Sequence, residues 1–189
     1  MPRLRPAMGV GATERAARSL LHASGADVKD ESLADTPGRV ARMHAETLVP
    51  ASFDLTTFQS DEGSDELVIA RNIRFHSLCE HHLLPFHGVA HIGYLPGERI
   101  LGLSKLARVV DLFAASLQVQ ERLTRQIANW LEDHMEPRGV GVVLEAEHLC
   151  MSLRGTSKPG VTTVTSALHG LVRTDPRTSD EFLALAGRR

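Results

Sequence analysis

Residues 67–95, LVIARNIRFHSLCEHHLLPFHGVAHIGYL, decide the fold. Apolar and β-branched residues from Leu67 to Ile73 predict one strand, and residues 86–95 predict a second. The short connection between the two strands is rich in histidine, and a tight connection favours antiparallel pairing. The segment therefore predicts an antiparallel sheet whose first two strands are joined by a Cys- and His-rich turn.

Helical patterns lie on both sides of this segment. Thr36, followed by Pro37, predicts a helix start, and Ser104 predicts another as an N-cap. Thr178 and Glu181 have the spacing of a capping box for a last short helix. The other expected helices and strands are helices at 12–23, 37–49, 104–117 and 119–134, and strands at 141–153 and 161–168.

This order of elements predicts an α+β fold in which an antiparallel sheet is covered by helices on one face. We expect an N-terminal helical region at 1–66 and a domain carrying the sheet at 67–189. Residues 1–10 are expected to form a tail. The acidic run within 51–66 is expected to be solvated loop; its charged members are Asp61, Glu62, Asp65 and Glu66.

The composition is that of a globular protein. The 189 residues are 42% hydrophobic and 23% charged, and the net charge of −2 gives no support for nucleic-acid or membrane binding. No apolar run is long enough to cross a bilayer, and the N-terminus lacks the apolar core of a secretory signal. We therefore expect a cytoplasmic protein whose two cysteines remain thiols.

The strongest local motif is Cys79-Glu80-His81-His82. A cysteine and a histidine three positions apart can both reach one metal ion from a turn, and Cys150 is a natural third donor. Three protein donors leave a fourth position for water, as in catalytic zinc sites. Three other interpretations remain open at this point: buried unreactive thiols, a disulfide, and a closed structural zinc site with one more histidine.

Further candidates follow from the expected strand and helix starts. In a strand, His148, Cys150, Ser152 and Arg154 would share one face, which would then offer a proton donor, a thiolate and a positive charge. At the start of the helix after Gly102, free backbone N–H groups with Lys105 and Arg108 could bind an anion, although this feature taken alone favours an ordinary Ser cap with solvated basic residues.

Together these pieces resemble the GTP cyclohydrolase I family over roughly residues 35–186. Motifs in the right order are more specific than any one alone. The motifs are Asp35-Thr36-Pro37-Gly38-Arg39, Cys79-Glu80-His81-His82, Gly102-Leu103-Ser104-Lys105-Leu106-Ala107-Arg108, Gln118-Val119-Gln120-Glu121-Arg122-Leu123-Thr124, Glu147-His148-Leu149-Cys150 and Arg154-Gly155.

The resemblance implies a reaction and an assembly. GTP is hydrolysed at C8, formate leaves, and the sugar rearranges and recloses to give 7,8-dihydroneopterin triphosphate, the first step toward tetrahydrofolate. The implied architecture is the tunnelling fold, an antiparallel sheet with helices on one face. Its implied assembly is a homodecamer of two pentamers with active sites between subunits.

The resemblance also implies a zinc site and two proton-transfer residues. Cys79, His82 and Cys150 match the Zn²⁺ ligands. His148 matches the acid that protonates the purine nitrogen beside C8, and His81 matches a second histidine that assists ring opening. Imidazole is the side chain that ordinarily exchanges a proton near neutral pH, which suits it to such a role.

The remaining matched residues would bind GTP. Glu121 with Gln120 matches a guanine-recognition pair, and Ser104 matches a serine near the ribose. The expected triphosphate contacts are Lys105, Arg108 and Arg154, with Arg39 donated across a subunit boundary. Glu80 belongs to the pocket motif without an assigned role.

Two other functions share this fold. A non-catalytic member would bind a pterin or a regulatory partner, and the presence of all three zinc ligands with His81, His148 and Glu121 argues against it. A nitrile reductase of the queuosine pathway would need a nucleophilic cysteine and no zinc triad. Metal analysis and product identification on GTP distinguish the three.

Overall fold

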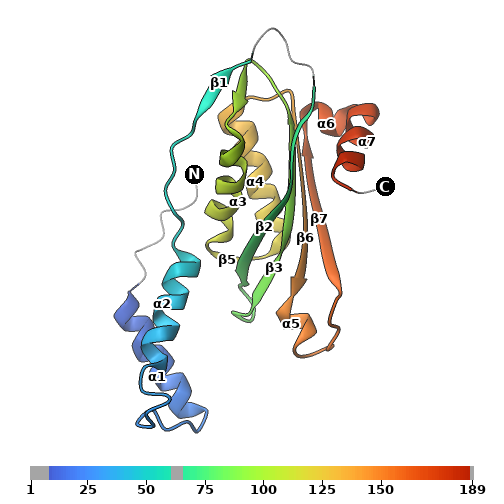
Figure 1. Cartoon of the computed structure of the whole chain (residues 1–189). Helices are drawn as coiled ribbons and strands as arrows, with labels where there is room; N and C mark the ends of the chain where they lie inside the picture. The colour runs from blue at the N-terminus through green and yellow to red at the C-terminus, as the bar shows by residue number, and fades with distance from the viewer. Residues whose placement is uncertain (1–8, 61–65, 188–189) are drawn as a thin grey trace. The chain divides into compact units, whose positions relative to one another are not determined.

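The computed structural model describes residues 9–60 and 66–187 (Figure 1). The chain divides into two compact units, one ending at Val49 and the other beginning at Pro50. The first unit holds helices α1 (Val10–Ala23) and α2 (Thr36–Leu48), which contact each other. The N-cap of α2 is Asp35, one residue before the expected Thr36, and Pro37 lies in the first turn as expected.

The second unit is built on a five-stranded sheet with the order β5-β2-β3-β6-β7 (Figure 1). All neighbours pair antiparallel except β2 and β5, which are parallel. The expected pairing of the first two strands is confirmed, since β2 and β3 form a long antiparallel ladder. The strands are β2 (Val68–Cys79), β3 (Pro85–Leu95), β5 (Leu117–Gln118), β6 (Gly139–His148) and β7 (Thr162–His169).

Two helices, α3 (Leu103–Ala114) and α4 (Gln120–Met135), cover one face of this sheet. Leu106, Val109, Val110 and Phe113 of α3 follow the spacing of a helix face, and all are buried in the core. Leu123, Ile127 and Leu131 form the same kind of stripe on α4. The expected α+β class is confirmed, and the packing of α3 and α4 on one face of the sheet agrees with the expected tunnelling fold, although the C-terminal helices lie on the other face.

The C-terminal helices α6 (Gly170–Thr174) and α7 (Pro176–Leu185) pack on the other side of the sheet. Successive side chains of a strand point to opposite faces, and Val143 of β6 packs with these helices, whereas Val142 and Leu144 pack in the main core. Phe182 is fully buried there. A Cβ atom at Gly141 would lie 2.6 Å from the Phe182 ring, and one at Gly93 would lie 2.8 Å from it. Glycine at these two positions therefore makes room for the ring.

The expected capping box of the last helix is wrong. The N-cap of α7 is Asp175, whose carboxylate accepts from the backbone N–H of Thr178 at 3.0 Å and from its hydroxyl at 2.5 Å. Pro176 occupies the first turn. Asp175 followed by proline is itself a helix-start signal, so the helix begins earlier than Thr178.

The long strand expected at 141–153 is also wrong. β6 ends at His148, and α5 (Leu149–Ser152) follows it. Phe86 of β3 is paired with His148, so the next residue of β6 would face Pro85, the first residue of β3. Proline has no N–H to donate, and the ladder stops there. His148, Cys150, Ser152 and Arg154 therefore do not share a strand face.

Two further differences concern residues 57–104. Strand β1 (Thr57–Gln59) pairs with β4 (Arg99–Leu101), where a loop was expected for residues 51–66. Gly102, not Ser104, is the N-cap of α3, and no side chain caps that helix. The expected acidic cluster at Asp61, Glu62 and Asp65, and most of the expected tail, lie outside the described residues. Within residues 9–60 and 66–187, no helix has the length and apolarity needed to span a bilayer.

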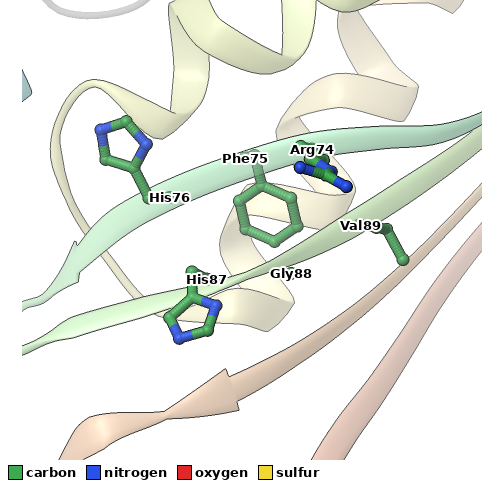
Figure 2. A pocket seen from close by; sticks show the side chains of 6 residues that line it. All are labelled: Arg74, Phe75, His76, His87, Gly88 and Val89. Carbon is green, nitrogen blue, oxygen red and sulfur yellow. The ribbon is translucent and has the colours of Figure 1, made fainter.

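A pocket of about 430 Å³ opens over β2 and β3 (Figure 2). His76 and His87 are directly opposite each other in the ladder, and Figure 2 shows their rings turned apart. Phe75 and Gly88 form the next opposite pair along the same two strands, and Arg74 and Val89 form the pair after that. The pocket is lined by none of the residues expected to bind metal or GTP, so it is not the candidate site.

Candidate metal centre and active site

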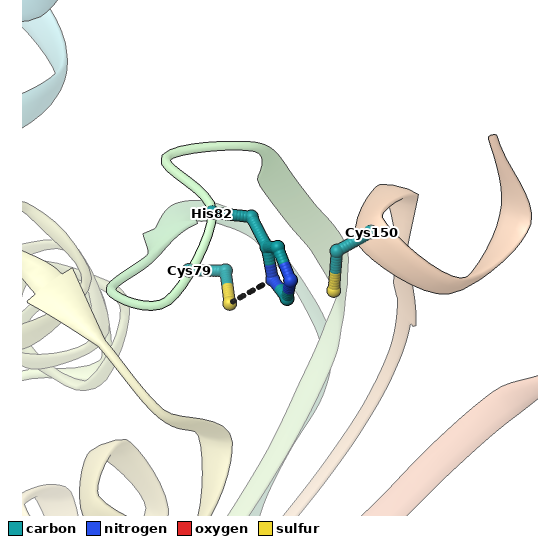
Figure 3. A group of neighbouring side chains, drawn as sticks. All are labelled: Cys79, His82 and Cys150. Carbon is teal, nitrogen blue, oxygen red and sulfur yellow. Dashed lines mark hydrogen bonds between the residues drawn. The ribbon is translucent and has the colours of Figure 1, made fainter. Parts of the chain in front are cut away.

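The side chains of Cys79, His82 and Cys150 converge on one point (Figure 3). One donor atom from each lies within 4.8 Å of the other two, and the Cys79 Sγ atom is 4.0 Å from His82 Nδ1. His81 Nδ1 is nearer to Cys79 Sγ, at 3.8 Å. Among the described residues, however, it is His82 and not His81 that completes a group with both thiols.

The turn after β2 places the first two donors. Cys79 is the last residue of β2, and its N–H and carbonyl bond to the Leu84 carbonyl and the Leu83 N–H at 2.9 and 2.8 Å. Leu83 has a φ of 54°, in the left-handed region that non-glycine residues rarely adopt. The turn is thereby closed tightly enough to bring His82 back over Cys79.

The third donor comes from the end of β6. Because β6 stops at His148, Cys150 stands on the short helix α5 and faces the turn after β2 (Figure 3). Burial and the neighbouring Cys79 thiol raise the pKa of Cys150, while the positive charge of Arg154 acts in the opposite direction. Both cysteines are free thiols, and a cation at this point would stabilise their thiolates.

His148 lies beside this cluster in a fixed orientation. Its ring stacks on Phe86 with a centroid separation of 4.7 Å and an interplanar angle of 3°. Its Nε2 atom is 2.8 Å from the Gln120 Oε1 atom. Burial lowers the pKa of His148, and the carboxylate of Glu121 partly opposes that shift. The expected proton-transfer residue is therefore positioned by α4 and β3.

The start of α4 brings Gln120 and Glu121 to the cluster in different ways. The Gln120 side chain is buried, whereas Glu121 is exposed in the first turn. Glu121 directly follows Gln120, which contacts His148, and its charge opposes the lowering of the His148 pKa. Glu121 is thus accessible to a ligand next to the candidate metal centre.

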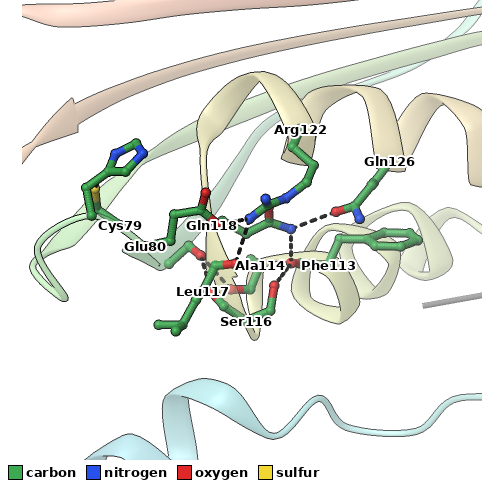
Figure 4. Close-up of polar contacts among 11 residues, drawn as sticks. Cys79, Glu80, Phe113, Ala114, Ser116, Leu117, Gln118, Arg122 and Gln126 are labelled. Atoms are coloured by element: carbon green, nitrogen blue, oxygen red, sulfur yellow. Dashed lines mark hydrogen bonds and ion pairs between the residues drawn. The ribbon is translucent and has the colours of Figure 1, made fainter. Parts of the chain in front are cut away.

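Arg122 was part of a quoted motif but had no expected role. Its Nη2 atom donates to Glu80 at 2.5 Å and to the Leu117 carbonyl at 2.8 Å, and its Nε atom donates to Gln118 at 2.9 Å (Figure 4). Gln118 is buried and donates in turn to the Phe113 carbonyl at 3.0 Å. Arg122 therefore connects the Cys79 turn to α4 and β5, a role that only the spatial contacts reveal.

The expected ribose and phosphate contacts lie elsewhere in this unit. Ser104 is exposed in the first turn of α3, whereas the carbonyl of Ala114 at the other end accepts from Ser77, two residues before Cys79, at 2.7 Å. At 1.5 Å per residue, Ser104 is about 15 Å along the helix from that end. Lys105 follows Ser104 at that distant end, and its ammonium group lies 5.9 Å from the Phe53 ring centroid, whereas Arg108 lies near the middle of the helix.

The two remaining arginines differ in their surroundings. Arg154 is exposed just after α5, and its charge is felt by Cys150. Arg39 belongs to the N-terminal unit, where its Nη2 atom is 3.6 Å from the Asp35 carboxylate. Arg154 is thus close enough to influence the cluster, and Arg39 has a partner within its own helical unit.

Known proteins resemble this chain over nearly its whole length. A family model described as GTP cyclohydrolase I matches residues 13–187. The GTP cyclohydrolase 1 of Aquifex aeolicus is 53% identical over 172 residues, covering 91% of this chain and 94% of the relative. The GTP cyclohydrolase 1 of Mycobacteroides abscessus is 53% identical over 182 residues, covering 93% and 88%.

Two other matches differ in strength. The GTP cyclohydrolase 1 of Thermoanaerobacter pseudethanolicus is 50% identical over 177 residues, covering 91% of this chain and 94% of the relative. Among solved structures, the apo form of the archaeosine synthase QueF-Like is 19% identical, with a TM-score of 0.44 over 55% of this chain and 93% of that chain.

Proposed function

The chain belongs to the GTP cyclohydrolase I family, and we propose that Cys79, His82 and Cys150 bind the zinc ion with which it hydrolyses GTP. Its reaction is the hydrolysis of GTP at C8 with release of formate and rearrangement to 7,8-dihydroneopterin triphosphate. The convergence of two thiols and one imidazole within 4.8 Å is the observation that carries the zinc assignment.

The donor set fits zinc. Two donors on one tetrahedral zinc ion lie about 3.5 to 3.8 Å apart, close to the 4.0 Å between Cys79 Sγ and His82 Nδ1. Thiolate and imidazole donors favour zinc over magnesium, calcium or manganese. Three protein donors are the number found in catalytic zinc sites. When bound, zinc supplies Lewis-acid activation of water at neutral pH.

The side chains around the cluster then have different roles in the reaction of GTP. His148 gives a proton to the purine nitrogen beside C8, which weakens the ring bond that must break. His81, on the same turn as two metal ligands, assists later proton transfers. The exposed carboxylate of Glu121 accepts hydrogen bonds from the guanine N–H edge. Adenine does not present that edge, so it would leave the carboxylate unpaired and would bind less well. Arg154, next to α5, contacts the triphosphate.

The separation between the ends of α3 supports an active site shared between copies of the chain. Ser104, Lys105 and Arg108 lie about 15 Å, about 14 Å and about 9 Å along α3 from Ala114, whose carbonyl accepts from Ser77. We propose that a neighbouring subunit in a homodecamer supplies these three residues, and that Arg39 also acts across a subunit boundary.

Two other expectations stay predictions. One is the division of the chain into an N-terminal helical region ending at residue 66 and a catalytic domain beginning at residue 67. The other is the cytoplasmic location.

The test is an assay of the purified, zinc-loaded chain with GTP. Formate release and the fluorescence of the oxidised pterin product should both appear, and ATP should give neither. If metal-loaded protein makes neither product from GTP, the proposed reaction is wrong. Size measurement in solution tests the decamer separately, and a monomer with full activity would contradict the shared site.

A further inference from the structure

The side chain of Gln120 has a fixed orientation. It is 1% exposed at the first position of α4. Its Nε2 atom lies 3.2 Å from the Leu144 carbonyl oxygen and 2.9 Å from the Thr163 carbonyl oxygen. A carbonyl oxygen can only accept a hydrogen bond, so the amide nitrogen, with its two hydrogens, must occupy this end of the side chain.

Two hydroxyl groups agree with this orientation. The Thr124 hydroxyl donates to the backbone carbonyl of Gln120 at 2.8 Å. The Thr165 hydroxyl, 2.7 Å from Thr124 Oγ1, must then supply the hydrogen of that contact. Its oxygen is left to accept from Gln120 Nε2 at 3.1 Å. Every atom that contacts this end of the Gln120 amide is therefore a hydrogen-bond acceptor for the amide nitrogen.

The other end of the amide faces His148. Gln120 Oε1 is 2.8 Å from His148 Nε2, and an amide oxygen can only accept. His148 Nε2 must therefore carry a hydrogen whether the ring is neutral or charged. Stacking on Phe86 at 4.7 Å and 3° holds the plane of the ring. Within residues 9–60 and 66–187, no group hydrogen-bonds His148 Nδ1.

We propose that Gln120 is a positioning residue that keeps His148 in its Nε2–H form, so that His148 exchanges its catalytic proton with the substrate through Nδ1. This inference rests on the proposed function for the role of His148. The charged ring gives its Nδ1 proton to the purine nitrogen and remains neutral with Nε2–H bonded to Gln120. The same Nδ1 atom later takes a proton back, which restores the charged ring.

The proposal changes the role expected for Gln120. Every hydrogen-bonding group of its side chain is already engaged with the protein, so guanine recognition falls to the exposed carboxylate of Glu121. A guanine contact and a positioning role differ in their kinetic effects, because losing a ground-state contact raises KM, whereas misplacing a proton-transfer group lowers kcat.

The kinetic test replaces Gln120 with methionine, which has a similar length and neither donates nor accepts strongly. In Gln120→Met, kcat for formate release should fall about tenfold or more, while KM for GTP changes less than about twofold. The matched control is Thr165→Val, which removes one contact but keeps the two carbonyls that orient Gln120; its kcat should stay within about twofold of wild type. A raised KM with unchanged kcat in Gln120→Met would overturn the positioning role.

A second measurement needs no substrate and no variant of Gln120. Solid-state NMR of the zinc-loaded protein with ¹⁵N-labelled histidine distinguishes ring nitrogens with and without hydrogen. The His148 signals, assigned by their loss in His148→Gln, should show a protonated Nε2 and a bare Nδ1 at alkaline pH. A protonated Nδ1 with a bare Nε2 would overturn the proposal even if GTP is hydrolysed, and the expected pattern would support it even if GTP is not the substrate.

Discussion

Replacing Arg122 with methionine should destabilise the turn that carries two of the candidate zinc ligands. Arg122 donates three hydrogen bonds, to Gln118, Leu117 and Glu80, and these tie the residue after Cys79 to α4 (Figure 4). Methionine keeps most of the aliphatic length of the side chain but none of the donors. The loss of stability in Arg122→Met therefore measures the contribution of the hydrogen bonds more than that of the packing.

The size of the effect follows from the exposure of the partners. The bonds to the buried Gln118 side chain and to the Leu117 carbonyl are worth about 1 kcal/mol each. The side chains of Arg122 and Glu80 are 33% and 34% exposed, so solvent screening reduces their ion pair to about 0.5 kcal/mol. The sum, about 2 to 3 kcal/mol, corresponds to a Tm lower by about 4 to 12 °C for a chain of this length.

The assay is thermal unfolding of zinc-loaded wild type and variants at one protein concentration. Arg125→Met is the matched control, because Arg125 is exposed on the same helix. Its Tm should stay within about 1 °C of wild type. In Arg122→Met the fraction of bound zinc should also fall faster when a chelator is added. Equal Tm values for the two variants would show that the hydrogen bonds of Arg122 do not stabilise this turn.

Three further predictions concern other parts of the molecule. His148→Ala should retain zinc but lower formate release by about 10²- to 10⁴-fold, as measured with GTP, and unchanged release would exclude its role in proton transfer. Gly141→Ala should lower the Tm by the equivalent of about 1 to 3 kcal/mol, because the new Cβ would lie 2.6 Å from the Phe182 ring; an unchanged melting curve would contradict this packing. The hydrogen bonds from Thr178 lower the pKa of Asp175 below its ordinary value of 3.8, so the helix cap stabilises the fold at neutral pH and is lost as the pH falls through the lowered pKa. The Tm difference between wild type and Asp175→Ala should therefore shrink from pH 7 to about pH 3, and a constant difference would argue against the cap.

The local patterns predicted the central sheet and its helices well, because their signals are contained in neighbouring residues. The stripes of α3 and α4 and the pairing of β2 with β3 follow from side-chain periodicity. The Cys79 to His82 motif likewise predicted its own convergence, since both donors belong to one turn. Cys150 was expected as the third donor because it is the only other cysteine in the sequence, and the family resemblance matched it to a zinc ligand, although no local pattern connects it to that turn.

The errors arose where the outcome depends on a distant partner. The end of β6 is set by Pro85 on the neighbouring strand, which cannot be read from residues 141–153 alone. The contact of Gln120 with His148 depends on two carbonyl groups from β6 and β7. Ser104 has the residue type of a cap, but Gly102 occupies that position because the chain leaves β4 there.

We propose that Cys79, His82 and Cys150 bind the zinc ion that GTP hydrolysis requires. The most direct measurement determines zinc content and formate release together, on matched preparations of wild type and Cys150→Ser. Wild type should hold about one zinc ion per chain and release formate from GTP, whereas Cys150→Ser should hold none and release none, because the site depends on a thiolate donor. Full zinc occupancy in Cys150→Ser, or formate release by zinc-free wild type, would contradict the assignment of Cys79, His82 and Cys150 as the ligands of a required zinc ion.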